Sequence, residues 1–135
     1  MDILASAIKL AEFAREEAGR LKVPMTFCVI DLHGNIVLKH RMTGANLISL
    51  EMAERKAYTV AALHMKTSEI SALTQAGQPF HLVAMAAGDR YWTDGGGVPL
   101  SIDGQLVAGF GVSGGSVAQD VEVAEAAIRA FEAAR

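Results

Sequence analysis

The chain has a single cysteine in 135 residues, no excess of positive charge and no long apolar run. One cysteine, Cys28, excludes an internal disulfide and a metal site built from several thiolates. The net charge of −3 disfavours a nucleic-acid partner, because binding to phosphates needs a basic face. No stretch reaches the roughly 18 consecutive apolar residues of a membrane-spanning helix, so we expect no membrane partner.

The N-terminus also lacks the pattern of a secretory signal, since Asp2, Lys9 and Glu12 interrupt its apolar residues. We therefore expect a cytoplasmic protein. No linker, repeat or low-complexity segment divides the chain, which predicts a single domain over residues 1–135. Hydrophobic residues make up 51% of this short chain, so we expect some apolar surface to be buried between the subunits of a homo-oligomer.

Hydrophobic periodicity and turn residues predict the secondary structure. The expected helices cover residues 2–20, from Asn46 or Ser49 to about 64, from 67 or 68 to 75, and from Ser116 to the C-terminus. The expected strands cover residues 25–31, 35–42, 81–87, 98–102 and 106–112. We expect Asp2 to cap the first helix, Ser116 and Gln119 to form a capping box, and Asp103-Gly104 to make a hairpin turn.

Two of these strands, over residues 82–87 and 106–112, are apolar on both faces. Such strands indicate a sheet that is covered on both sides. The hairpin turns make neighbouring strands antiparallel. The sequence therefore predicts an α/β (α+β) fold in three α/β/α layers, with a five-stranded antiparallel sheet and the element order α-ββ-αα-βββ-α.

Five motifs occur in order along nearly the whole chain: Val29–Asn35, Arg41–Ala45, Arg55–Thr59, Gly96–Pro99 and Gly111–Asp120. Together they resemble the GlcG/HbpS-like family, which includes the C-terminal domain of PduO-type proteins. The resemblance implies a profilin-like sheet, homo-oligomers and, in some members, haem binding. Other members lie beside genes for corrinoid-dependent diol or glycerol breakdown or for glycolate use. Thr43 stands where the family usually has Asp, which puts any role for a carboxylate there in doubt.

Two cations and the glycine-rich segments are the candidate ligand-binding residues. Arg41 ends a strand and Lys56 lies inside the next helix, and both side chains suit a ligand with carboxylates. Residues 111–116 lead into a helix N-terminus, where free amides favour an anion. We expect haem propionates or a small organic acid to contact these residues: Arg41, Lys56, Gly96, Gly97, Ser113, Gly114 and Gly115.

Structural roles are the alternative for each of these groups. Arg41 could pair with Asp31 or Asp94, and Lys56 could be a solvated helix residue. Ser116 and Asp120 could cap the last helix rather than contact a ligand. Ser113 lacks a histidine or acidic partner that would make it a nucleophile.

The four histidines show no HxxH or HExxH spacing, so a metal-hydrolase site has no support. A haem iron needs only one axial nitrogen. His40, beside the end of a strand, and His64, at the end of a helix, are the candidate iron ligands, although a structural role is an alternative for each.

The leading interpretation is a non-catalytic, oligomeric protein that binds haem, a related tetrapyrrole or another small anionic molecule. The resemblance adds an accessory role in corrinoid-dependent diol or glycerol breakdown or in glycolate use. One alternative is a small enzyme acting on a carboxylate or carbonyl substrate, with Lys56 or a histidine as the acid–base group. The absence of a triad and of paired carboxylates disfavours it. Another alternative is an assembly module with a vestigial pocket.

Overall fold

The computed structural model of the chain describes residues 2–88 and 90–135. The helices of these residues are α1 (Ile3–Leu21), α2 (Ile48–Leu63), α3 (Thr67–Leu73), α4 (Val117–Ala133) and a 3₁₀ helix, η1 (Val83–Gly88). Their strands are β1 (Thr26–Asp31), β2 (Ile36–Arg41), β3 (Gly97–Ile102) and β4 (Gln105–Ser113). The strands form one antiparallel sheet in the order β2-β1-β4-β3, so β2 and β3 are its edges.

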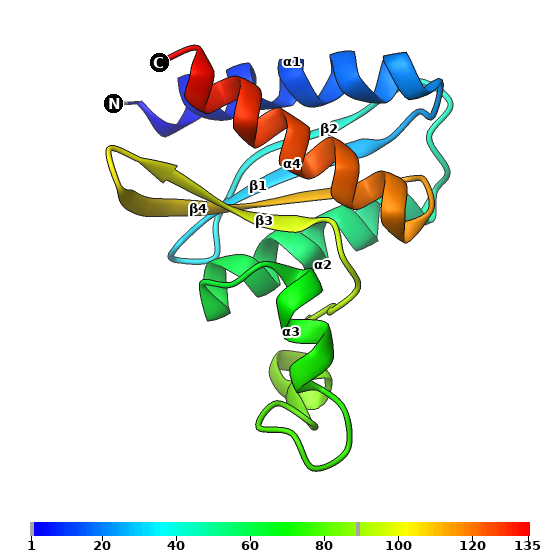
Figure 1. Cartoon of the computed structure of the whole chain (residues 1–135), viewed down its shortest axis with the longest axis vertical. Helices are drawn as coiled ribbons and strands as arrows, with labels where there is room; N and C mark the ends of the chain where they lie inside the picture. The colour runs from blue at the N-terminus through cyan, green and yellow to red at the C-terminus, as the bar shows by residue number, and fades with distance from the viewer. Residues whose placement is uncertain (1, 89) are drawn as a thin grey trace.

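Helices cover both faces of this sheet, as expected (Figure 1). Successive side chains of a strand point to opposite faces. Phe27 and Val29 of β1 pack in the core beneath α1 and α4, whereas Cys28 and Ile30 pack on α2. The three-layer α+β architecture with an antiparallel sheet is thus confirmed for the described residues.

Helix α2 lies directly on β4, and Gly111 makes this possible. A Cβ atom at Gly111 would lie 2.1 Å from the carbonyl oxygen of Ala53, which is closer than any side chain tolerates. The small residues Ala53, Ala57 and Ala61 form the matching face of the helix. This close contact fixes the position of α2, and therefore of Lys56, relative to the end of β4.

The prediction of a strand over residues 81–87 is wrong. The predicted five-stranded sheet, and the run of three consecutive strands before the last helix (βββ), are therefore wrong as well. Residues 83–88 form η1, so the sheet of the described residues has four strands. The backbone just before η1 forms short-range hydrogen bonds instead of a strand ladder. The N–H of His81 donates to the carbonyl of Gln78, and the N–H of Val83 donates to the carbonyl of Phe80. An apolar run that does not alternate with polar residues occurs both in buried strands and in buried helices, so the pattern alone cannot tell them apart. Alanine, which is frequent here, also disfavours strands.

The chain between α2 and β3 extends away from the body of the molecule, where α3 and η1 lie below the sheet in Figure 1. Leu82 in this extension is 64% exposed. The extension returns to α2 at Trp92, whose backbone N–H donates to the hydroxyl of Thr59 at 2.8 Å. It therefore brings residues 90–92 beside the middle of α2.

Most of the expected helix ends are confirmed. Asp2 accepts a hydrogen bond from the N–H of Leu4, and Ser116 and Gln119 form the capping box of α4. The side chain of Asn46 accepts from the N–H of Ser49, one residue into α2. Helix α1 continues past Gly19 and ends at Leu21, and its C-cap Lys22 adopts the left-handed conformation. None of the helices in residues 2–88 and 90–135 combines the length and apolarity needed to cross a bilayer.

Candidate functional site

The structure brings most of the predicted ligand-binding residues to one end of the sheet. Arg41 pairs with Thr26, and Thr26 pairs with Ser113, so the three lie side by side where β2 ends, β1 begins and β4 ends. The carbonyl of Gly96 accepts from the N–H of Val112, which places the turn before β3 at the same end. We call this region, from Arg41 to Ser113 and Gly96, the Ser113 end of the sheet.

A buried ion pair lies beneath it. The ammonium of Lys56 donates to the carboxylate of Asp120 and to the carbonyl of Val112, each at 2.9 Å. Both side chains are almost fully buried, with Lys56 and Asp120 each 3% exposed. Lys56 is thus neither solvated nor open to a pocket, and it joins α2 to α4 through the end of β4.

Asp120 occupies the position at which the sequence predicted an anion. Its other carboxylate oxygen accepts from the N–H of Gly115 at 2.9 Å. Burial raises the pKa of Asp120 above its usual value, and the charge and hydrogen bond of Lys56 partly oppose this. The helix N-terminus is therefore filled by a carboxylate of the chain itself.

Gly96 adopts a φ of +123°, and a Cβ there would lie 2.8 Å from the Lys56 ammonium. Gly97 donates its N–H to the hydroxyl of Thr67 at 2.8 Å. The carbonyl of Gly114 accepts from the side-chain amide of Asn46 at 3.5 Å. These glycines thus allow the strand ends, α2 and α4 to approach each other, and their contacts in the structure are with the chain itself.

Arg41 is the predicted cation that faces outward. Its Nε and Nη2 atoms donate to the carbonyl of Ala45 at 3.1 and 2.8 Å, which closes the loop between β2 and α2. It does not pair with Asp31, whose carboxylate accepts from the N–H groups of His33 and Asn35. These bonds lower the pKa of Asp31, led by the one from Asn35. A guanidinium has five N–H donors, so Arg41 keeps donors for a second acceptor.

The two candidate iron ligands lie apart. His40 is exposed on edge strand β2, and its ring stacks on Phe27 with centroids 6.3 Å apart. His64 is the exposed C-cap of α2. Because Ala53 lies on Gly111 and Ala61 near Gly109, α2 runs away from the Ser113 end, and His64 lies at its far end. Within the part of the chain that the structure describes, no three metal-ligating side chains gather at one point.

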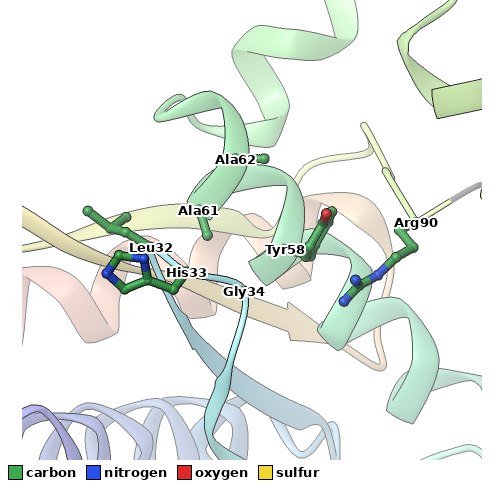
Figure 2. Close-up of a pocket in the computed structure, with 7 residues that line it drawn as sticks. All are labelled: Leu32, His33, Gly34, Tyr58, Ala61, Ala62 and Arg90. Carbon is green, nitrogen blue, oxygen red and sulfur yellow. The ribbon is translucent and has the colours of Figure 1, made fainter. Parts of the chain in front are cut away.

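Sequence reasoning missed a hollow between α2 and the turn that joins β1 to β2 (Figure 2). It has a volume of about 250 Å³ and is lined by Leu32, His33, Gly34, Tyr58, Ala61, Ala62 and Arg90. The Arg90 guanidinium carbon lies 3.8 Å from the centre of the Tyr58 ring. Tyr58 and His33 lie within two of the family motifs, and this position in the sequence could have pointed to them as site residues. Arg90 arrives from the extension, and nothing in the local sequence predicts that.

Comparisons with known proteins agree with the motifs. Residues 4–129 match the family described as haem degrading protein HbpS-like. An uncharacterized 15.0 kDa protein from the dhaT–dhaS intergenic region of Citrobacter freundii is 36% identical over 128 residues, which cover 95% of this chain and 90% of that protein. The corrinoid adenosyltransferase PduO of Salmonella typhimurium is 38% identical over 123 residues, which cover 91% of this chain and 37% of PduO.

This chain therefore spans little more than a third of that PduO relative. Among solved structures, the crystal structure of a PduOC:heme complex is 37% identical, with a TM-score of 0.88, and the match covers 93% of this chain and 91% of that one. The family match extends over nearly the whole chain and includes all five motifs. The chain belongs to the HbpS-like family.

Proposed function

We propose that this protein binds haem or a related tetrapyrrole. The observation that carries the proposal is the similarity to the PduOC:heme complex, at 37% identity and a TM-score of 0.88 over 93% of this chain. Ligand chemistry is argued from side chains rather than from the fold alone. The side chains at the Ser113 end of the sheet must therefore suit the ligand.

Haem offers an apolar ring, two carboxylates and an iron that takes an axial nitrogen. His40 and Arg41 are neighbouring exposed residues on edge strand β2. A guanidinium suits a propionate, and an imidazole suits the iron. These groups fit haem in kind, so we assign Arg41 to a propionate. His40 points to the opposite face of the sheet from Arg41, and at the open edge of β2 it would hold the iron in preference to the distant His64. When bound, haem would supply a redox-active iron.

The other predicted residues act in two ways in this proposal. Gly114 lies at the same end of the sheet as Arg41, is partly exposed and would contact the ligand directly, whereas Ser113 is only 7% exposed and would line the floor of the site. Lys56, Gly96, Gly97 and Gly115 would support them from below, because their polar groups already bind within the chain. Lys56 is thus a positioning residue. Its burial also disfavours the alternative in which it serves as the acid–base group of an enzyme.

The test is a spectroscopic titration of the apoprotein with haem. We expect a Soret band in the wild type and an affinity at least about tenfold weaker in Arg41→Gln, since a charge-assisted hydrogen bond contributes about 1.5–3 kcal/mol. Arg15→Gln is the matched control, because Arg15 is an exposed arginine of α1 paired with Glu12. His40→Ala should shift the Soret band, and His64→Ala should leave it unchanged.

Two outcomes would overturn the proposal at different levels. A wild-type protein without a Soret band would exclude haem as the ligand. Wild-type affinity in Arg41→Gln together with an unshifted band in His40→Ala would move the site elsewhere. A parallel titration with cobalamin distinguishes haem from a corrinoid, and so tests the accessory role in corrinoid-dependent breakdown. Loss of the Soret band with time, in the presence of a reductant, would distinguish haem degradation from binding alone.

A further inference from the structure

We propose that the hollow between α2 and the turn that joins β1 to β2 binds a small organic carboxylate, and that Arg90 takes the carboxylate group. The turn follows Asp31, the last residue of β1, whereas Thr26 begins β1 at the Ser113 end of the sheet. The hollow therefore lies at the opposite end of the sheet from the proposed haem site. Binding of a carboxylate here does not depend on haem.

Arg90 is the cation of this hollow, and no carboxylate of the described chain neutralises it. In residues 2–88 and 90–135, Arg90 forms no ion pair. Glu51 and Glu54 line a neighbouring hollow together with Arg90. However, Glu51 pairs with Arg55 at 2.8 Å, and Glu54 pairs with Lys39 at 3.0 Å. The guanidinium therefore keeps its charge for an anion from outside the chain.

The ring of Tyr58 holds this guanidinium in place. The guanidinium carbon lies 3.8 Å from the ring centre, where the electron-rich face of the ring attracts a cation. This contact needs no acceptor oxygen, so N–H groups of Arg90 stay available to a ligand. The Tyr58 ring is itself fixed, since the ring of Tyr91 packs on it with centroids 5.5 Å apart and a Cβ at Gly34 would lie 3.7 Å from it. Arg90 is thus positioned before a ligand binds, which lowers the entropic cost of binding.

The lining of the hollow favours an organic anion. Its polar side chains are those of Arg90, Tyr58 and His33, and none of its described lining residues is acidic. Two alanines of α2 and Leu32 supply apolar walls. An inorganic anion would leave these walls in contact with water, whereas a carboxylate with a hydrocarbon body would cover them. A carboxylate also matches the planar fork of a guanidinium.

The volume of the hollow limits the size of the ligand. The hollow measures about 250 Å³. An apolar cavity of about 150 Å³ is enough to bind benzene in another protein. The hollow therefore has room for an aromatic ring together with a carboxylate, as in benzoate. Figure 2 shows Arg90 at one side of the hollow and Leu32 and His33 at the other, so the ring of such a ligand would lie toward Leu32.

Titration calorimetry with benzoate tests the site. We expect saturable binding with a dissociation constant of about 1 mM or tighter, which is within reach of so small a ligand. Benzyl alcohol has the same ring without the charge, and inorganic phosphate has the charge without the ring. Each should bind at least about tenfold more weakly than benzoate, because each loses one of the two kinds of contact. Absence of benzoate binding, or equal binding of either control compound, would overturn the proposal.

Arg90→Gln tests the cation. We expect the affinity for benzoate to fall at least about tenfold, because the variant loses charge-assisted hydrogen bonds to the carboxylate. Arg90 is exposed, so the variant should fold as the wild type does. Arg20→Gln is the matched control, since Arg20 is an exposed arginine of α1 that pairs with Glu17. Wild-type affinity in Arg90→Gln would exclude Arg90 as the residue that binds the carboxylate.

Tyr58 is a positioning residue in this proposal, because it acts through Arg90. Tyr58→Leu should weaken benzoate binding, since it removes the aromatic face under the guanidinium. Tyr58→Phe keeps that face and should recover most of the affinity. Equal losses in the two variants would contradict the role of the ring.

Nuclear magnetic resonance locates the bound benzoate. The backbone amide signals of Gly34 and Ala62, which line the hollow, should shift on titration. The signal of Gly114, at the Ser113 end of the sheet, should stay in place. This comparison separates the hollow from the proposed haem site, where Arg41 also suits a carboxylate. Shifts confined to the Ser113 end would overturn the proposal and leave the haem site unaffected.

Discussion

The carboxylate of Asp120 binds the ammonium of Lys56 and the N–H of Gly115, and these contacts join α4, α2 and the end of β4. Local sequence correctly placed Asp120 in the first turn of its helix. It did not reveal the ion pair, because the two partners are far apart along the chain. In residues 2–88 and 90–135, no buried side-chain polar atom is left without a hydrogen bond.

Lys56→Met should destabilise the fold by about 3–5 kcal/mol, because it leaves the buried Asp120 carboxylate without its cation. Chemical denaturation at neutral pH measures this loss. The double variant Lys56→Met/Asp120→Asn should recover part of it, since no buried charge is then left. Equal stability of the single variant and the wild type would show that the ion pair contributes nothing.

The same single variant should depend on pH in a defined direction. Without Lys56, only backbone hydrogen bonds such as that of Gly115 oppose the effect of burial, so the pKa of Asp120 rises further. A carboxyl whose pKa is higher in the folded than in the unfolded protein adds stability below the unfolded pKa, and this stability is lost as the pH rises through the folded pKa. Lys56→Met should therefore gain stability relative to the double variant on acidification. A parallel pH dependence of the two proteins would contradict this.

At the scale of elements, the hairpin between β3 and β4 depends on two residues. Ile102 pairs with Gln105, and between them Asp103 and Gly104 have φ angles of 52° and 80°. A turn with both central residues at positive φ is the type that the Asp-Gly pair predicts, so this prediction is confirmed. No atom lies within 4 Å of a Cβ built on Gly104, so there is space for a side chain. Glycine is needed here only because of the positive φ angle.

Gly104→Val should therefore destabilise the protein by more than about 1 kcal/mol, because a β-branched residue at positive φ is strained. Thermal unfolding measures the change. Gly19→Ala is the opposite control: Gly19 lies inside α1 with nothing near its Cβ, so alanine should stabilise by up to about 1 kcal/mol. An unchanged melting temperature in Gly104→Val would show that the turn tolerates the side chain.

At the scale of the whole molecule, the start of α2 lies at the Ser113 end of the sheet. The hydroxyl of Ser49 is 2.7 Å from that of Thr26, which pairs with both Arg41 and Ser113. Ile48, the first residue of α2, is 60% exposed. A carboxylate at this position would repel an anionic ligand bound at this end, so Ile48→Glu should weaken haem binding more than Ile36→Glu, because Ile36 is similarly exposed but begins β2 at the opposite end of the sheet. Equal haem affinities of the two variants would contradict this placement of the ligand.

The sequence alone determined what depends on near neighbours: the helices with their caps, the strand pair at Asp103-Gly104, the covered sheet and, through five motifs, the family. Only the tertiary structure decided that residues 81–87 lie outside the sheet, because an apolar run becomes a strand only where the rest of the fold brings it alongside a sheet edge. It alone placed Lys56 on Asp120 and Arg90 over Tyr58. Such contacts join residues far apart in the chain, and their free energy depends on burial, which no local pattern specifies.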